Sequence, residues 1–376
     1  MKLCIISHTE HYQTASGEWV GWGPTVSELN HLAAHFETIF HIAMLHLGTP
    51  PPSALPYTAS NIQFVALPPS GGRTIAAKIQ SIWKAPKVIK IVSQTLKKAD
   101  VFQLRTPTGI GVYLIPYLTL FVKKPGWYKY AGNWNQANPP LGYRLQRWML
   151  KKQSRKVTIN GHWPNQPVHC LTFENPCLTE ADLEAGLAWS KKKTYKSPLT
   201  FCYVGRLELE KGVGRIIQAF TELSPEAKAK VKTVHLVGDG PERPHFEAEA
   251  QKAGVEIRFH GYLPREQVFE VFKISDIFLM PTTASEGFPK VIAEAMNFGC
   301  IPVVSNVSAI AQYVINGKQG YILDTVSLDT IQEVLYAILK DGIDGNIIKN
   351  LKGNRDIVNR FSFKHYNNRI LKLLEK

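Results

Sequence analysis

Two glutamates stand eight residues apart in the segment SEGFPKVIAEAMNFG, residues 285–299. Pro289 suits the first position of a helix, and Gly299 suits the left-handed residue that ends one. Between them, apolar residues recur at helical spacing. We therefore predict Glu286 in the loop before the helix and Glu294 about two turns inside it. Carboxylates accept hydrogen bonds and a helix amino end offers free N–H groups, so the segment suits a ligand with an anionic part and several hydroxyls.

Two cations follow an expected strand over residues 199–205. Gly205 ends this strand, and Arg206 and Lys211 are spaced across the turn that leads into a helix. Either cation alone would be an ordinary surface residue. Together with a glycine turn at the carboxyl end of a strand, they form a candidate phosphate clamp.

A second glycine turn, LVGDGPE, closes the strand expected over residues 232–238. Gly238 and Gly240 would let a ligand approach the backbone closely. Because the carboxyl ends of parallel strands meet at one sheet edge, both turns are expected to open onto the same ligand.

Apolar strand-like runs alternate with helical patterns along the whole chain, which indicates parallel sheets with helices on both faces. The expected strands are 2–7, 40–46, 62–68, 100–105, 127–132, 156–160, 168–175, 199–205, 232–238, 256–261, 276–281, 301–306 and 320–323. Two successive sets predict an α/β fold with two doubly wound, Rossmann-like domains. We place the join between Asn175 and Pro198, where a polar, lysine-rich stretch intervenes; a long surface loop inside one domain is the alternative.

Composition excludes several protein classes. With 376 residues, 44% hydrophobic and 20% charged, the chain is long enough for two or three ordinary domains and is not disordered. The start reads as a strand, not as a signal peptide. Five scattered cysteines indicate neither disulfides nor zinc and favour the reducing cytoplasm. The apolar run 110–122 is too short to span a membrane and contains Pro116, so we expect a buried helix.

Positive charge is concentrated in the first half of the chain. Residues 1–178 carry 18 lysines and arginines against 6 aspartates and glutamates, a difference of 12 positive charges, whereas the other 198 residues carry 26 against 24. Such a field attracts anionic partners, of which nucleic acid and acidic lipid both qualify. The stretch 76–98 mixes lysines with Trp83 and aliphatics around Pro86, as an interfacial helix does. An ordinary amphipathic helix that covers the sheet fits the same pattern.

In their order, GRLELEKGV, LVGDGPE, FHGYLP and EGFPKVIAEAMNFGCIPVVS resemble the carboxyl half of retaining nucleotide-sugar glycosyltransferases of the GT-B fold, glycosyltransferase family four, group 1. The resemblance covers about residues 200–323 and implies two Rossmann-like domains that face each other across a cleft. It implies an acceptor-side domain over 1–178, a donor-binding domain over 179–358, and a last helix over 359–376 that crosses back to the first domain.

The resemblance also implies roles for individual residues. Arg206 and Lys211 would neutralise the donor diphosphate, Glu294 would accept hydrogen bonds from ribose, and Glu286 would meet the transferred sugar. The remaining donor-binding candidates are Gly205, Gly238, Gly240, Gly287, Phe288 and Pro289. Similar enzymes retain anomeric configuration and need neither metal nor cofactor, since cations stabilise the leaving phosphate.

The first half departs from that family's pattern. The usual Gly-Gly loop after the first strand is replaced by residues 7–26, where Gly17, Gly21 and Gly23 are the substitutes. Asn133 stands where many members have a histidine. Asn133 and Arg105 are the candidates in the first domain, with His8 and His11 as alternatives. For Asn133 and Arg105, loop stabilisation through side-chain to backbone hydrogen bonds is the other interpretation. The i, i+4 pair His31 and His35 lacks an HExxH companion, so we expect no metal there.

These observations predict a glycosyltransferase that uses a nucleotide-diphospho-sugar, with UDP- or GDP-sugars as expected donors and a glycan or lipid-linked acceptor of cell-surface polysaccharide or glycolipid synthesis. We expect it in the cytoplasm, with possible attachment to the acidic inner face of the cell membrane. A nucleotide-sugar epimerase or a phosphorylase would share the fold. A basic nucleic-acid-binding or scaffold protein is the alternative from another class, but no nucleic-acid recognition motif is present and no nucleic acid is expected.

Overall fold

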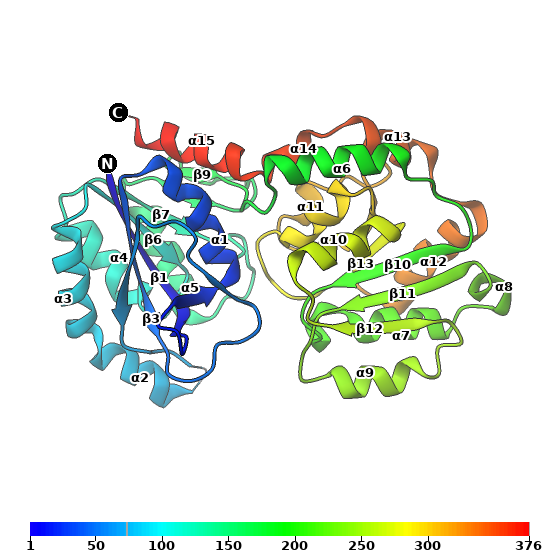
Figure 1. The fold of residues 1–376 in the computed structure, drawn as a ribbon, viewed down its shortest axis with the longest axis horizontal. Coiled ribbons are helices and arrows are strands. Elements are labelled where there is room, and N and C mark those ends of the chain that lie inside the picture. The colour runs from blue at the N-terminus through cyan, green and yellow to red at the C-terminus, as the bar shows by residue number, and fades with distance from the viewer. Residues whose placement is uncertain (73, 376) are drawn as a thin grey trace. The chain divides into compact units, whose positions relative to one another are not determined.

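The computed structural model describes residues 1–72 and 74–375, which divide into two compact units (Figure 1). Unit 1 comprises Met1–Asn175 together with the chain from Tyr366 onward, and unit 2 comprises Pro176–His365. The division expected at 178/179 thus falls at 175/176 in the structure. The chain returns to unit 1 at Tyr366, seven residues later than the start expected for the last segment.

Unit 1 is built on one nine-stranded sheet. Its strands are β1 (Lys2–Gln13), β2 (Trp19–Trp22), β3 (Thr38–Leu45), β4 (Ala54–Pro56), β5 (Ile62–Leu67), β6 (Val101–Thr106), β7 (Gly126–Tyr130), β8 (Val157–Ile159) and β9 (Cys170–Thr172). The order β5-β3-β1-β6-β7-β8-β9 is parallel throughout, as alternation predicts. β2 and β4, which the sequence did not indicate, add an antiparallel extension beside β1.

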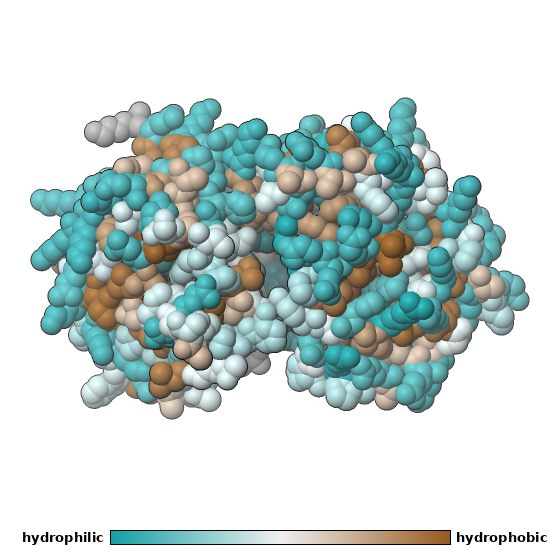
Figure 2. Space-filling view, in the orientation of Figure 1, coloured by the Kyte–Doolittle hydropathy of each residue, from teal (hydrophilic) through white to brown (hydrophobic). Residues whose placement is uncertain are grey.

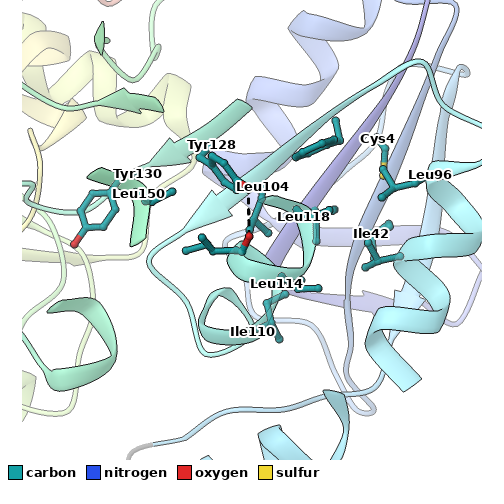
Figure 3. Close-up of a cluster of buried hydrophobic side chains, with 14 of the residues drawn as sticks. Cys4, Ile42, Leu96, Leu104, Ile110, Leu114, Leu118, Tyr128, Tyr130 and Leu150 are labelled. Carbon is teal, nitrogen blue, oxygen red and sulfur yellow. Dashed lines mark hydrogen bonds between the residues drawn. The ribbon is translucent and has the colours of Figure 1, made fainter. Parts of the chain in front are cut away.

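Helices cover both faces of this sheet. They are α1 (Gly23–Leu32), α2 (Ile75–Trp83), α3 (Ala85–Leu96), α4 (Gly111–Leu120), α5 (Leu141–Lys152), α15 (Phe363–Leu374) and the short η1 (Ala33–His35). One core lies under α3, α4 and α5, and Figure 3 shows Leu96, Leu114 and Leu150 from these helices gathered with strand residues. The other core joins α1 and α15 to the opposite face, through side chains such as Leu29 and Ile370.

The run 110–122 forms α4 and confirms the expected buried helix over most of its length. Ile110, Leu114 and Leu118 are fully buried, and Pro116 lies inside the helix. The last residues differ from the expectation, because Leu120 and Phe121 are exposed to solvent. Within the residues that the structure describes, no helix is long and apolar enough to cross a bilayer.

The stretch 76–98 forms two helices, and the break falls at Lys84, just before Pro86. Val88 and Val92 are fully buried against the sheet. The interfacial interpretation is therefore wrong for α3, which covers the sheet as an ordinary amphipathic helix. For α2, whose Trp83 is exposed, the interfacial interpretation stays a prediction. Arg73 and the side chains of residues 75, 77 and 78 lie outside the described part of the chain.

Unit 2 is built on a six-stranded parallel sheet in the order β12-β11-β10-β13-β14-β15. Its strands are β10 (Leu199–Val204), β11 (Val231–Val237), β12 (Ile257–Gly261), β13 (Ile277–Met280), β14 (Ile301–Ser305) and β15 (Tyr321–Leu323). After β10 the chain adds β11 and β12 on one side of the sheet, and it then adds β13, β14 and β15 on the other side. The order in which strands are added therefore reverses between β10 and β13. In open α/β sheets ligands bind at such a reversal, beyond the carboxyl ends of the strands.

Two helical layers enclose this second sheet, with α10 and α11 on one face and α7 and α9 on the other (Figure 1). The helices are α6 (Glu180–Lys192), α7 (Val213–Thr221), α8 (Pro225–Lys228), α9 (Arg243–Ala250), α10 (Arg265–Ile274), α11 (Lys290–Asn297), α12 (Leu328–Asp341), α13 (Gly345–Gly353) and α14 (Asp356–Arg360), with short η2 (Leu209–Lys211) and η3 (Ile310–Gln312). All the strands expected in both halves are present, which confirms the predicted two-domain α/β fold.

Candidate active site

Two glycine turns lie against each other at the carboxyl edge of the second sheet. The N–H of Gly205 donates to the carbonyl of Val237 at 3.0 Å, so the turn after β10 extends its pairing with β11. Gly238 has a φ of +128°, and a Cβ on it would stand 1.8 Å from the carbonyl oxygen of Gly205. A larger residue at Gly238 would force the two turns apart, so glycine at this position allows them to pack against each other.

A second set of close contacts joins the same two turns. Leu207 N–H donates to the carbonyl of Asp239 at 2.9 Å, and a Cβ on Gly240 would stand 2.3 Å from the Leu207 carbonyl oxygen. The predicted donor-binding glycines Gly205, Gly238 and Gly240 therefore hold the loops after β10 and β11 against each other. We call these two joined loops the ledge of glycine turns.

Lys211 ends the short helix η2 and is largely buried. The next residue, Gly212, has a φ of +93°, and a Cβ there would stand 2.2 Å from the carbonyl oxygen of Pro281, just after β13. On the same loop, the Glu210 carbonyl accepts from the N–H of Thr283 at 2.8 Å. The loops after β10 and β13 are thus tied together across the reversal point, where Lys211 lies.

The ammonium of Lys211 forms an ion pair with the carboxylate of Glu286. These side chains are 75 residues apart in sequence, and the fold brings together two of the three predicted catalytic residues. The lysine side chain is 11% exposed and the glutamate 44%. A buried cation with a half-exposed partner can exchange that partner for a ligand anion without leaving water-excluded surroundings.

Arg206, the third predicted catalytic residue, lies apart from that pair. Its side chain is 64% exposed, and its guanidinium forms an ion pair with Glu208, with Nη1 3.0 Å from Oε1. Such an exposed pair contributes little to stability, so the guanidinium is free to be drawn to a stronger anion.

Tyr203 is a site residue that sequence reasoning missed. It is fully buried in β10, and its hydroxyl donates to the Arg206 carbonyl at 2.8 Å, which fixes the turn that carries Arg206. Burial raises the pKa of this phenol, and the charges of Glu286 and Glu208 raise it further. The sequence signal that could have indicated Tyr203 is an aromatic residue two positions before Gly205, the glycine of the turn.

Helix α11 follows the prediction closely. Pro289 has a φ of −65° and directly precedes the helix instead of occupying its first position, so the start is one residue later than expected. Gly299 is left-handed, with a φ of +77°, as predicted. Phe288 is buried and its ring lies 4.5 Å from that of Phe361, while the Gly287 carbonyl accepts from the N–H of Ala309 at 3.3 Å. These contacts anchor the loop that carries Glu286.

Glu294 lies in the second turn of α11, where it was predicted. Its side chain is 14% exposed, and its carboxylate is 4.0 Å from Nε of Arg265. The guanidinium binds Asp182 more closely, at 2.7 Å and 3.1 Å. Burial raises the pKa of Glu294, with the charges of Arg265 and Lys290 acting against it. A buried carboxylate with a distant partner retains acceptor capacity for ligand hydroxyls, which is typical of binding sites.

In unit 1, the candidates Arg105 and Asn133 are held by internal hydrogen bonds. Arg105 donates to Glu28 at 2.7 Å and to Gln103 at 3.1 Å, and Glu28 also accepts from Lys129. Asn133 Oδ1 accepts from the N–H of Asn135 at 3.0 Å, an Asx-type turn. The bond of Asn133 matches the alternative of loop stabilisation through a side-chain to backbone hydrogen bond, whereas the bonds of Arg105 go to side chains and do not match it.

Gly17 lies in an exposed hairpin turn between β1 and β2, with a φ of +85°. The region expected to form a loop after the first strand is instead the continuation of β1 to Gln13, followed by this hairpin. Backbone pairing with β2 extends the strand, a tertiary effect that the mixed composition of residues 7–26 does not reveal.

A cavity of about 310 Å³ opens at the carboxyl ends of β1 and β3 in unit 1. It is lined by His8, Thr9, Glu10, Trp22, Met44 and His46. Burial lowers the pKa of His8 to about 4, so this imidazole is neutral at pH 7. His8 was named from sequence, whereas Trp22 and His46 were not, because Trp22 lies at the end of β2 and His46 directly follows β3, both distant in sequence from His8.

His11, the other alternative, belongs to a buried hydrogen-bonded chain. The Tyr57 hydroxyl lies 2.9 Å from His11 and 2.6 Å from His41, whose other ring nitrogen lies 2.8 Å from Ser7 Oγ. His31 and His35 sit on α1 and η1. Among the described residues, no group of three or more His, Cys, Asp or Glu is placed to hold a metal ion.

Comparison with known proteins adds to this geometry. Residues 188–354 match the family model "Glycosyl transferases group 1", and this segment contains the Lys211–Glu286 pair and Glu294. The chain is 37% identical over 199 residues to a 2-deoxystreptamine glucosyltransferase of Streptomyces kanamyceticus, covering 49% of this chain and 51% of that protein. It is 30% identical over 149 residues to a lipopolysaccharide 1,2-N-acetylglucosaminetransferase of Salmonella typhimurium, covering 37% and 39%. The chain spans about half or less of the length of these curated relatives.

Solved structures match over the whole chain. Sucrose-phosphate synthase from Thermosynechococcus elongatus has a TM-score of 0.72 at 15% identity, covering 99% of this chain and 98% of that one. Anabaena HepE, solved in complex with UDP and glucose, has a TM-score of 0.66 at 16% identity, covering 100% and 99%. At this identity the likeness carries the fold, which is that of GT-B glycosyltransferases.

Proposed function

We propose that this protein is a retaining glycosyltransferase of family four that moves a sugar from a nucleotide-diphospho-sugar to a glycan or lipid-linked acceptor. The observation that carries the proposal is the Lys211–Glu286 ion pair at the reversal point of the second sheet, with Glu294 in the following helix. The match of residues 188–354 to group 1 glycosyl transferases supports it independently.

In this proposal the donor lies along the ledge of glycine turns. Glu294 accepts hydrogen bonds from the ribose, Lys211 and Arg206 bind the diphosphate, and Glu286 turns from Lys211 to the hydroxyls of the sugar. Gly287 and Phe288 contribute backbone N–H groups at the start of α11. The UDP and glucose bound in Anabaena HepE, a protein of the same fold, support a uridine nucleotide as the first donor to test, with GDP-sugars second.

The proposed chemistry needs charge stabilisation more than proton transfer. As the glycosidic bond to phosphate breaks, positive charge develops on the sugar ring and negative charge on the departing phosphate. A largely buried lysine held in place before the reaction stabilises that anion at little reorganisation cost. We propose that the cation pair takes the role of a divalent metal, so that chelators leave turnover unchanged. Attack on the same face, assisted by the leaving phosphate, would retain configuration.

For the acceptor, we propose a glycan or lipid-linked molecule of cell-surface polysaccharide or glycolipid synthesis, and a cytoplasmic protein attached peripherally to the inner face of the membrane. The excess of 12 positive charges in residues 1–178 supports the membrane part. The lipopolysaccharide relatives support the acceptor class.

A donor screen tests the proposal. The melting temperature of the protein is measured with UDP-, GDP- and ADP-sugars, and a raised value identifies the nucleotide. NMR of the product formed with a sugar acceptor then gives the anomeric configuration. No thermal shift with any nucleotide sugar would contradict the proposal. Inversion would contradict retention alone, and turnover without acceptor would indicate a different reaction.

A further inference from the structure

Helices α4 and α5 pack side by side and expose large apolar side chains on their outer surface. Five side chains, from 43% to 75% exposed, form what we call the α4–α5 surface: Leu120, Phe121, Leu141, Leu145 and Trp148. Soluble proteins expose single apolar residues routinely, but a cluster of leucines and aromatics on one surface marks an interaction site.

The geometry of α5 places its exposed residues in one stripe. Leu141, Leu145 and Trp148 recur at spacings of four and three, whereas Gln146 and Leu150 face inward and are buried. Residues three and four apart share a helix face. The stripe is therefore a continuous ridge along the helix.

Hydrogen bonds hold the middle of α5 and the chain just beyond its end. In the middle of the helix, the Gln146 side chain donates to the Thr108 carbonyl at 2.9 Å and accepts from the Thr108 N–H at 3.0 Å. Beyond its end, Arg155 donates to the carbonyls of Lys124 at 2.8 Å and Leu118 at 3.4 Å, beside the end of α4. These bonds fix α5 with its apolar stripe exposed, and they hold the chain beyond α5 against the end of α4, where Leu120 and Phe121 are also exposed.

Exposed cations surround these apolar residues. Lys123 follows α4, Arg144 lies within the stripe, and Lys151 and Lys152 occupy the last turn of α5. Between Asp100 and Glu174 the sequence has no acidic residue, so no carboxylate of this segment neutralises them. Aliphatic and tryptophan side chains among lysines and arginines are the composition of a helix that lies in a membrane interface.

We infer that the α4–α5 surface docks on a bilayer rich in acidic phospholipids, with the apolar stripe entering the headgroup boundary and the cations binding lipid phosphates. A second copy of the chain would bring like charges together. Nucleic acid would satisfy the cations but would leave the leucines exposed. The inference rests on the membrane part of the proposed function and names its surface, which lies outside the donor site.

Helices α2 and α3 of unit 1 each present only part of the combination of exposed apolar residues and cations that α4 and α5 present, as judged from their described side chains. α3 has exposed Lys87 and Lys90, but its aliphatic residues are buried, so it can add attraction without insertion. α2 exposes Ile79, Ile82 and Trp83, and Figure 2 shows apolar atoms over α2 beside hydrophilic ones over α3. α2 lacks the exposed cations that border α5 within its described side chains, which makes it an auxiliary contact.

Vesicle sedimentation of the whole protein tests the surface. Vesicles of phosphatidylcholine with 30 mol% phosphatidylglycerol are compared with pure phosphatidylcholine at low and high salt, for wild type and three variants. Lys151→Glu with Lys152→Glu reverses the charge, and Leu145→Ser with Trp148→Ser removes the stripe. Lys340→Glu with Lys349→Glu makes the same charge change at exposed positions of unit 2.

We expect wild type to sediment with the acidic vesicles, and salt to weaken this. Since each cation near an acidic leaflet changes partitioning about fivefold, the α5 charge reversal should lower it by at least tenfold. The Leu145/Trp148 variant should lose binding as well, and it should lose part of the fluorescence quenching that brominated phosphatidylcholine causes in wild type. The unit 2 variant should bind as wild type does. Far-UV circular dichroism and melting temperature confirm that each variant is folded.

Three outcomes would overturn the inference: wild type that ignores acidic vesicles at low salt, α5 variants that bind normally, or an equal loss in the unit 2 variant. Conversion of a dimer to a monomer by Leu145→Ser with Trp148→Ser would also overturn it in favour of self-association, and binding to RNA but not to vesicles would overturn it in favour of nucleic acid. Donor turnover without vesicles, measured in parallel, separates the two proposals. Turnover without vesicle binding refutes this inference alone, and vesicle binding without turnover refutes the enzyme alone.

Discussion

Lys211 and Arg206 differ in burial, but both are predicted to bind the donor diphosphate. We expect Lys211→Ala and Arg206→Ala each to lower kcat/KM by about 10²–10³, since each removes a charge from the departing phosphate. Steady-state kinetics with the donor identified by thermal shift measures this. Arg258→Ala is the matched control, because Arg258 is a similarly exposed arginine paired with a glutamate two residues away, on β12. Near-normal kinetics in both site variants would refute the assignment.

Substitution of the two glutamates of the candidate site should have different effects on nucleotide binding and on turnover. Glu294→Ala should weaken binding of free nucleoside diphosphate, because we propose that Glu294 accepts hydrogen bonds from the ribose. Glu286→Ala should preserve or improve that binding, since it releases Lys211 from its ion pair, while turnover falls. Calorimetry with the bare nucleotide separates the two effects. Equal losses of nucleotide affinity would count against the division of roles.

Sequence could name these residues because glycine turns and helix boundaries leave local signals. It could not show that Lys211 pairs with Glu286 or that Arg265 binds Asp182, since these partners are 75 and 83 residues apart. Nor could it show that Arg265 lies near Glu294, because the two residues belong to different helices. The contacts of Arg105 could not be predicted for the same reason. Its buried partner Glu28 lies on α1, and no local pattern shows which acid a buried arginine will meet.

The glycine turns form the element on which the site depends most. Gly238→Ala should lower the melting temperature, because the new methyl group would overlap the Gly205 carbonyl in a backbone conformation that alanine rarely adopts. Overpacking of this kind costs about 1–3 kcal/mol. Gly345→Ala is the control, since no atom lies within 4 Å of that added Cβ and the residue is helical, where alanine stabilises. Opposite signs for the two variants are expected, and an unchanged Gly238→Ala protein would contradict the close packing of the turns.

The strand ends of unit 1 carry a pH-sensitive element. Burial lowers the pKa of His11 to about 4, against 6.5 when the chain is unfolded. Between these values the unfolded chain binds the extra proton, so the free energy of unfolding falls as pH drops from about 6.5 to 4. One such histidine contributes a slope of up to about 1.4 kcal/mol per pH unit. In urea titrations across this range, His11→Gln should reduce the slope, and an unchanged slope would show that His11 is not held neutral.

At the element scale, alternation and apolar runs predicted the strands of both parallel sheets. β2 and β4 escaped prediction because they are short and exist through antiparallel pairing with β1. For 76–98 the sequence left two interpretations open, because periodicity shows that a helix is amphipathic but not whether its apolar side contacts the protein or a membrane. Burial of Val88 and Val92 decides that question for α3.

At the scale of the whole molecule, α15 belongs to unit 1 from Tyr366 onward, so that unit is discontinuous in sequence. Ile370 is fully buried in the core with Leu3 and Leu29. Ile370→Ala should cost about 2–5 kcal/mol. In calorimetry we expect the transition of unit 1 to move to lower temperature while that of unit 2 changes little. A shift of the unit 2 transition alone would contradict the assignment of this helix.

The late return of the chain to unit 1 also sets an order for its biosynthesis. A nascent chain on the ribosome has all of unit 2 available before residues 366–375 emerge, but the core around Leu3, Leu29 and Trp127 lacks Tyr366 and Ile370 until then. Unit 1, although translated first, is therefore completed last. During that interval its uncovered sheet face is the surface that chaperones would meet, and a release of the chain a few codons early would leave that face permanently open to proteolysis.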